Sequence, residues 1–365
     1  MKILCDRAKL QEAFGIVSSV VSPKTPNPIL RNVLLKAEGE GITLTGTDLE
    51  LAATVVLDAV KVAKAGKVLL PARETAALLR ELNDPTITLE SKDLKTRIES
   101  GGGSFVLLGE NPDEFAEMGE IENAKELTIE AGQLLAMTQE TTFAAAREET
   151  RYAINGVLMD YGANCLRLVA TDGRRLAMSY RNIEGGKKDL KAVVPTRAMT
   201  TVARAIKEGS KDPMRIAVGE KQIRFSSGGV TITCQLLEAR YPDYESAIPK
   251  AADTTLEIDK ALFESSLRKA SILASDDLRM VRFEASDGDL RITAENSSRG
   301  RAEVRMAVVT KGAGGSINFN PDYLLEALRV SSVETVRLDM SDDSMPAKFT
   351  LGESFSYVVM PISGA

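Results

Sequence analysis

Apolar residues recur at helical spacing near the start of the chain, at Leu10, Phe14, Val17 and Val21. A short alternating stretch precedes them, so the pattern predicts a strand followed by a helix. Pro23 and the prolines after it end this helix and begin a connector.

Alternating apolar stretches continue along the chain and predict further strands. They cover residues 33–37, 42–46, 51–56 and 67–70, then 86–89, 94–98 and 104–108. A second helix is predicted over about residues 73–82. The segment therefore contains two modules, each a strand, a helix and further strands. This predicts an α+β domain with two helices and about eight strands in antiparallel sheets.

The same pattern occurs three times. Thr47-Asp48 is followed at a separation of 124 residues by Thr171-Asp172, and Pro71-Ala72-Arg73 by Pro195-Thr196-Arg197. Adding the same separation to Leu166-Arg167-Leu168 leads to Leu290-Arg291-Ile292. We interpret the chain as three tandem copies of one domain. The predicted domains are residues 1–124, 125–252 and 253–365.

The copies differ in the loop between the first helix and the next strand. The third copy is five residues shorter there, whereas the longer loops of the first two carry Lys24 and Arg147. Surface loops vary freely in length, so the difference has a simple structural explanation. The alternative is that the two basic loops reach a polyanion.

Composition narrows the class of function. The chain has no histidine, which removes the usual general base and the commonest metal ligand. Its three cysteines are widely spaced and indicate buried thiols in a reducing cytoplasm, without a disulfide framework or zinc site. We expect no cofactor and no metal. No apolar run of about 18 residues and no secretory signal are found, so neither a membrane span nor secretion is expected.

Charge is unevenly distributed over the three copies. The net charge is −6 for the chain, and it divides into −5, +4 and −5 for the three predicted domains. An acidic protein is not an obvious nucleic-acid binder. It can be one where its basic residues gather on one surface.

Candidate chemistry is sparse. Gly101-Gly102-Gly103 lacks the Lys-Ser/Thr of a phosphate-binding loop, and Asp287-Gly288-Asp289 lacks the other ligands of a calcium loop, so both predict turns. Two segments stand out. Residues 171–177 replace Leu49-Glu50-Leu51 of the first copy by a glycine and two arginines, and residues 357–362 end in adaptable apolar side chains beside a proline. Adaptable apolar residues at a surface suit a groove for short peptides.

These segments carry a resemblance to a known family. The chain resembles the bacterial sliding clamp, the beta subunit of the replicative DNA polymerase, over its whole length. The matching stretches are Pro28-Ile29-Leu30, residues 44–50, Arg151-Tyr152 with Asn155-Gly156, residues 169–177, residues 241–244, Phe319-Asn320 with Tyr323, and residues 357–361.

The resemblance implies a head-to-tail homodimer, a ring of six similar domains with helices lining a central hole. It also implies a groove that receives short linear motifs of polymerases, clamp loader and repair proteins. The groove residues would be Arg151, Ile154, Thr171, Gly173, Arg174, Arg175, Leu176, Pro242, Ala247, Asn320, Tyr323, Val358, Val359, Met360, Pro361 and Ile362. Arg151, Arg174, Arg175, Asn320 and Tyr323 would form its rim. Two positions depart from the family pattern, where His often stands at Arg174 and Arg at Ser246.

Two further sets of residues are predicted from this arrangement. Contacts with duplex DNA are expected from Lys24, Arg73, Arg147, Tyr152, Arg197, Arg268 and Lys269. The dimer contact is expected to join Phe105 and Leu107 of one chain to Ile272 and Leu273 of the other.

The favoured function is a DNA-encircling processivity factor without catalysis. It would hold duplex DNA topologically and independently of sequence, and would act in the cytoplasm at the nucleoid. Its partners would be the replicative polymerase, the clamp loader and other polymerases and repair proteins with clamp-binding motifs. The alternative is a triplicated peptide-binding scaffold that does not encircle DNA. An enzyme is disfavoured because histidine is absent and no catalytic constellation is found.

Overall fold

The computed structural model describes residues 1–58, 60–148, 154–183, 189–275 and 279–362. The first repeat contains β1 (Lys2–Asp6), α1 (Arg7–Ser18), β2 (Asn32–Glu38), β3 (Gly41–Thr47), β4 (Leu51–Leu57), β5 (Lys61–Lys64), β6 (Gly66–Pro71), α2 (Ala72–Glu81), β7 (Thr86–Lys92), β8 (Lys95–Ser100) and β9 (Gly103–Leu108). The second contains β10 (Lys125–Glu130), α3 (Ala131–Thr142), β11 (Gly156–Gly162), β12 (Cys165–Thr171), β13 (Arg175–Asn182), β14 (Leu190–Pro195), α4 (Thr196–Ala205), β15 (Pro213–Val218), β16 (Gln222–Ser227) and β17 (Val230–Gln235). The third contains β18 (Thr254–Asp259), α5 (Lys260–Ser271), β19 (Val281–Ser286), β20 (Asp289–Asn296), β21 (Gly300–Ala307), β22 (Val309–Gly312), β23 (Gly315–Phe319), α6 (Pro321–Val330), β24 (Thr335–Met340), β25 (Ala347–Thr350) and β26 (Phe355–Val359).

This element order confirms the α+β fold and the two strand–helix–strands modules in each repeat. One prediction was too long: α1 ends at Ser18, and Val21 lies beyond it. Two short strands, β5 and β22, were not predicted. Both pair with the first strand of their repeat, β1 and β18 respectively. No helix within the described ranges is long and apolar enough to cross a membrane.

The chain divides into two compact units that do not coincide with the repeats. The first consists of residues 1–135 and 197–236, and the second of residues 136–196 and 237–365. The second repeat is therefore shared. Its strands β15–β17 belong to the first unit and β11–β14 to the second.

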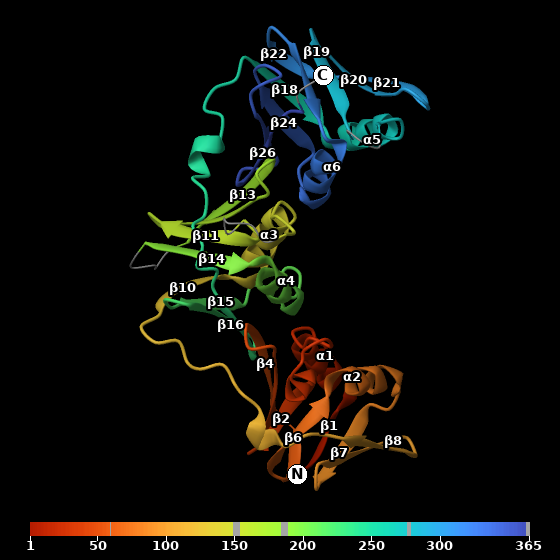
Figure 1. Cartoon of the computed structure of the whole chain (residues 1–365), viewed down its shortest axis with the longest axis vertical. Coiled ribbons are helices and arrows are strands. Elements are labelled where there is room, and N and C mark those ends of the chain that lie inside the picture. The colour runs from red at the N-terminus through yellow and green to blue at the C-terminus, as the bar shows by residue number, and fades with distance from the viewer. Residues whose placement is uncertain (59, 149–153, 184–188, 276–278, 363–365) are drawn as a thin grey trace. The chain divides into compact units, whose positions relative to one another are not determined.

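In the first unit, an eight-stranded antiparallel sheet runs in the order β10-β15-β16-β17-β4-β3-β2-β6. A five-stranded sheet has the order β5-β1-β7-β8-β9. Helix α1 packs against α2 and against β3 and β4, and the two helices lie side by side (Figure 1). The approach is close at Gly46, where a Cβ atom would lie 2.3 Å from the carbonyl oxygen of Val17. Glycine is therefore needed at this crossing.

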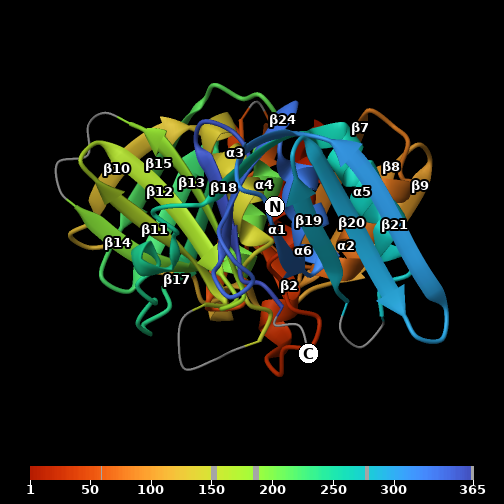
Figure 2. The same cartoon turned by 90° about the horizontal axis from the view of Figure 1, so that it is seen from above.

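In the second unit, a nine-stranded antiparallel sheet runs in the order β14-β11-β12-β13-β26-β25-β24-β18-β22. A four-stranded sheet has the order β21-β20-β19-β23. Helix α5 packs on β20 and β21, and Figure 2 shows β19, β20 and β21 as neighbouring strands with α5 beside them. Under α5 lie aromatic rings in edge contact, with Phe283 at 5.8 Å from Phe263 and 5.2 Å from Phe319.

Three helices, α1, α5 and α6, begin at a side-chain cap. The Asp6 carboxylate accepts a hydrogen bond from the backbone N–H of Lys9 (2.9 Å), and Asp259 accepts one from Leu262 (2.8 Å). Asn320 does the same for α6, with Pro321 in the first helical position. Such caps satisfy backbone donors that the helix itself leaves unpaired.

One strand pair joins the repeats in each unit. In the first unit β4 pairs with β17, so that Leu51 lies opposite Cys234. In the second unit β13 pairs with β26, so that Leu176 lies opposite Val358. In both pairs, the third strand after a repeat's first helix meets the last strand of the next repeat's second module. The repeats are thus connected by continuous backbone hydrogen bonding.

Candidate functional site

The turn at residues 171–175 is built by its own side chains. The Asp172 carboxylate accepts hydrogen bonds from the backbone N–H groups of Arg174 (2.9 Å) and Arg175 (3.1 Å). The Thr171 hydroxyl donates to the carbonyl of Arg175 (2.6 Å) and accepts from the N–H of Gly173 (3.1 Å). Gly173 has φ +86°, a conformation that glycine adopts without strain. The turn is fixed before any partner binds, and it exposes Gly173 and Arg174.

The family resemblance placed Arg175 on the rim of the groove. In the structure this residue is buried instead and is only 7% exposed. Its guanidinium pairs with Asp172 (3.0 Å) and with Glu326, and donates to the carbonyl of Phe143 (2.8 Å). It also lies 4.4 Å from the centre of the Tyr323 ring. The burial is stable because the charge has hydrogen-bond partners and an aromatic face around it.

The strand β26 brings the C-terminal apolar segment beside this turn. Arg175 lies opposite Val359 in the β13–β26 pair. Beyond the strand, the N–H of Met360 donates to the carbonyl of Arg174 (2.8 Å), and the N–H of Ile362 donates to the carbonyl of Asn318 (2.9 Å). The Met360 side chain is 45% exposed. Segments about 180 residues apart in sequence thus form one surface.

Beneath this surface lies an apolar cluster, here called the floor cluster. It consists of Leu158, Val169, Leu176, Val193, Tyr244 and Val358. Met178, Leu237, Tyr241 and Ile248 pack against it and are partly buried.

Two tyrosines anchor the floor cluster through their hydroxyls. Tyr241 donates to the carbonyl of Val169 (3.0 Å), and Tyr244 donates to the Asp160 carboxylate (3.1 Å). Burial raises the pKa of Tyr244, and the Asp160 charge raises this pKa further. Burial also raises the pKa of Tyr241. Both phenols therefore remain protonated and serve as hydrogen-bond donors.

The other predicted groove residues are spread over the same unit. Ile154, Pro242, Asn320, Tyr323, Pro361 and Ile362 are half-buried, and Ala247 is exposed. Arg151 lies outside the described residues. Only Leu176 and Val358 of the predicted set belong to the floor cluster itself.

Several residues at this site were missed in the sequence. Phe143 and Glu326 hold Arg175, and Tyr357 donates its hydroxyl to the carbonyl of Tyr323 (3.0 Å). Tyr241 and Tyr244 lie in the stretch 241–244 that matches the family, but they were not among the predicted groove residues. A signal is present there, since two tyrosines beside Pro242 are unusual for a solvated connector.

The residues predicted to contact DNA carry exposed charges where they are described. Lys24, Arg73, Arg147, Arg268 and Lys269 are exposed. Arg197 is half-exposed, but it pairs with Asp48 and donates to the carbonyl of Val20 (2.8 Å). Its guanidinium is therefore partly occupied by partners within the chain. Tyr152 lies outside the described residues. The six described helices carry ten basic and seven acidic residues, a net charge of +3 in a chain of −6.

The predicted dimer residues lie near two strands that end their sheets. β9 is the last strand of the five-stranded sheet and β21 that of the four-stranded sheet. Phe105 on β9 is 38% exposed, and Ile272, just after α5, is 73% exposed. Leu107 and Leu273 are half-buried.

Comparison with known proteins gives the same result over the whole chain. Residues 1–119, 128–243 and 245–363 match the N-terminal, central and C-terminal domains of the DNA polymerase III beta subunit. The beta sliding clamp of Pseudomonas aeruginosa is 32% identical over 368 residues, covering 99% of this chain and all of that protein. The beta sliding clamp of Escherichia coli K12 is 30% identical over 365 residues, with the same coverage. A crystal structure of the Pseudomonas aeruginosa clamp bound to griselimycin superposes with a TM-score of 0.94 at 30% identity and covers both chains fully. The resemblance inferred from the sequence is confirmed.

Proposed function

The chain belongs to the DNA polymerase III beta subunit family, the bacterial beta sliding clamps, and we propose from this premise how its own residues perform each part of that function. It is a DNA sliding clamp, a non-catalytic processivity factor of DNA replication. The observation that carries this conclusion is the match of all three repeats, in order, to the three domains of the family. We assign the domains as residues 1–124, 125–252 and 253–365.

We propose a head-to-tail homodimer that closes through β9 and β21. β21 is the third strand after the first helix of its repeat, as β4 and β13 are in theirs. β9 is the last strand of its repeat, as β17 and β26 are in theirs. Strands at these two positions pair with each other in β4–β17 and β13–β26. Pairing β9 of one chain with β21 of another would repeat the same junction. Each chain offers one strand of each kind, so two chains can make this contact twice. A head-to-tail contact closes into a ring only where the rotation fits, and six similar domains favour that closure.

Duplex DNA would pass through this ring and meet the helices. Their net charge of +3 in an acidic chain supports this assignment. Contacts from Lys24, Arg73, Arg147, Arg268 and Lys269 would be made to phosphates and would be independent of sequence. The contacts can be weak, since a closed ring retains DNA by topology.

The surface above the floor cluster is the proposed groove for linear motifs of partner proteins. Leu176, Val358 and the exposed Met360 offer apolar contact, and Arg174 offers an exposed charge at the edge. Peptides that carry Leu or Phe anchors would obtain most of their binding energy there. We propose as partners the replicative polymerase, the clamp loader, and other polymerases and repair proteins with clamp-binding motifs. We propose the nucleoid in the cytoplasm as the location.

Retention on circular DNA tests the topological function. The protein is loaded by its clamp loader onto a nicked plasmid, isolated by gel filtration, and the plasmid is then cut once. We expect the protein to stay on the circle and to leave the linear product. Equal retention on both forms would indicate conventional DNA binding, and loss from both would favour the peptide-binding scaffold.

A further inference from the structure

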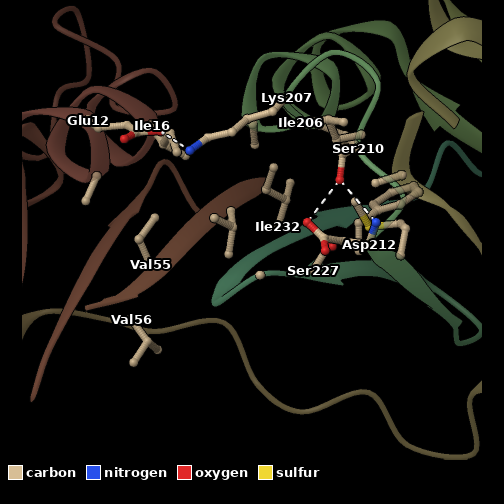
Figure 3. A pocket seen from close by; sticks show the side chains of 18 of the residues that line it. Glu12, Ile16, Val55, Val56, Ile206, Lys207, Ser210, Asp212, Ser227 and Ile232 are labelled. Carbon is tan, nitrogen blue, oxygen red and sulfur yellow. Dashed lines mark hydrogen bonds and ion pairs between the residues drawn. The ribbon is translucent and has the colours of Figure 1, made fainter. Parts of the chain in front are cut away.

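The first unit contains a cavity of about 350 Å³ beside the β4–β17 pair, here called the junction cavity. Helix α1 and strand β4 of the first repeat form one side, and α4 with β15–β17 of the second repeat form the other. Its floor is apolar, with Val202, Phe225 and Val230 among the lining side chains. Ile16, Val55 and Ile232 belong to the same lining (Figure 3). A concave apolar space of this size is typical of sites for small molecules.

The charged groups lie at the mouth of the cavity. Lys207 reaches toward Glu12 at 3.5 Å, as Figure 3 shows, but the two side chains are 82% and 60% exposed. Such a pair is weak, so the ammonium group can turn to another anion. Lys9 is a second exposed ammonium on the same rim. The Asp212 carboxylate is engaged on the wall, where it accepts a hydrogen bond from Ser210 (3.0 Å).

The equivalent place at the other junction is lined by polar side chains that bond to one another. The residues equivalent to Ile16, Val55 and Leu57 there are Glu140, Ser179 and Arg181, each 124 residues later, and the strand pairing places Phe355 where the cavity has Val230. There the Ser179 hydroxyl donates to the Glu140 carboxylate, Arg181 pairs with that carboxylate at 3.3 Å, and Arg181 donates to the Ser354 hydroxyl. The second junction thus satisfies its own groups. The first has apolar residues at the three positions that Glu140, Ser179 and Arg181 occupy in the second, and these residues line an open space.

We propose that the junction cavity binds an amphiphilic monoanion, a small molecule with an apolar body and one negative group, such as a medium-chain carboxylate. The body would cover the aliphatic floor, and the anion would sit at the mouth beside Lys207 and Lys9. An extended peptide is less suited, because β4 and β17 pair with each other there and offer no free backbone edge.

Two consequences follow from the position of the cavity. Its lining residues all lie in the first unit, whereas the floor cluster lies in the second. Occupancy is therefore independent of a peptide in the proposed groove. A bound ligand contacts both α1 and α4 and so stabilises the folded first unit in proportion to its concentration. Binding at the junction cavity requires neither the ring nor DNA.

The test uses the full-length protein and the fluorescence of 1-anilinonaphthalene-8-sulfonate, an aromatic monoanion. We expect saturable binding at one site per chain, displaced by decanoate and not by decylamine, which has a similar chain and the opposite charge. A half-buried lining residue, Ala205, allows the space to be filled by Ala205→Phe, and Ser227→Phe fills it from β16. Each is expected to lower the affinity at least tenfold.

Matched variants separate the cavity from other apolar surfaces. Lys207→Gln should weaken binding about threefold to tenfold through loss of charge, whereas Lys211→Gln, an exposed lysine outside the lining, should leave it unchanged. Met360→Ala in the proposed groove should also leave it unchanged. Undiminished binding in both filled variants, with cooperative thermal unfolding retained, would overturn the proposal. Displacement by decylamine as well as by decanoate would overturn the charge assignment.

Discussion

The buried guanidinium of Arg175 ties together three segments that are distant in sequence. It holds Asp172 in the turn, the carbonyl of Phe143 after α3 and Glu326 on α6, and it lies over the Tyr323 ring. Its neighbour Arg174 is exposed. The two adjacent arginines are therefore placed differently: Arg175 holds the site together, and Arg174 is the one proposed to meet a partner.

Replacing Arg175 by alanine should lower the free energy of unfolding by about 3–5 kcal/mol, because two carboxylates lose a buried partner. Urea denaturation followed by circular dichroism measures this change. Arg174→Ala is the control and should change stability by less than about 0.5 kcal/mol. Similar values for the two variants would contradict the structural role of Arg175.

Met360 carries the sharpest prediction for the proposed groove. Met360→Ala should weaken binding of a polymerase C-terminal peptide by about 1–2 kcal/mol, about fivefold to thirtyfold in Kd, because the variant removes an adaptable apolar side chain from the surface. Fluorescence polarisation with a labelled peptide measures this. Leu4→Ala removes a comparably exposed side chain from the first unit and should have no effect. Deleting residues 358–365 is not a clean test, because Val358 and Val359 are buried between β13 and β25.

The cysteines provide a test of burial. Burial, with the nearby Asp6 charge, raises the pKa of Cys5 to about 12, and burial raises the pKa of Cys234 to about 12. In a Cys165→Ala background, a thiolate-selective reagent at pH 8 should modify the native protein at least about 100-fold more slowly than the urea-unfolded chain. Because the folded state keeps these protons while the unfolded state loses them, stability should fall as the pH rises from about 9 to 12. Equal modification rates in both states would show that the thiols are accessible.

At the scale of elements, the β13–β26 and β4–β17 pairs bring together strands that are far apart in the sequence. β4 and β13 are equivalent strands, as are β17 and β26, and the proposed pairing of β9 with β21 across two chains follows the same pattern.

Ile272→Ala combined with Leu273→Ala should yield monomers at micromolar concentration, since burying each of these side chains contributes about 1.5–3 kcal/mol. Analytical ultracentrifugation reads the mass directly. Val309→Ala, which truncates another exposed side chain of the third repeat, should remain dimeric. A dimer of unchanged affinity in the double variant would place the interface elsewhere.

Most elements could be predicted because alternation and helical spacing are local. The strands at 33–37 and 42–46 lie within β2 and β3, and the helix at 73–82 matches α2 within a residue at each end. The burial of Arg175 could not be predicted, because its partners Phe143 and Glu326 are 32 and 151 residues away. The junction cavity was missed for a similar reason. Apolar residues such as Ile16 and Val55 have the pattern of a core, and only the structure shows that the core is incomplete there.

At the scale of the whole molecule, an acidic chain must contact an acidic polymer. The helices carry more basic than acidic residues, ten against seven, which eases the conflict, and a closed ring needs only weak attraction to retain DNA while it slides. The charge pattern of the helices is therefore more informative than the net charge of −6.

Reversing Lys24 and Arg73 to Glu should reduce loading on DNA and lower the salt dependence of binding by about 0.9 in slope for each phosphate that the variant no longer neutralises. Filter binding over a range of salt concentrations gives the slope. Lys61→Glu with Lys64→Glu makes the same change of charge on β5 and should leave the slope unchanged. An equal decrease in both double variants would mean that only total charge matters.

The pairing of β13 with β26 also has a consequence in time. Leu176 is synthesised long before its partner Val358, and at about 5–20 residues per second the delay is roughly 10–40 seconds. During this interval the edge of β13 and the apolar residues beneath it have no cover from β26. An uncovered strand edge can pair with other chains. The proposed partner groove therefore begins as a strand edge that is open to misassociation on the ribosome.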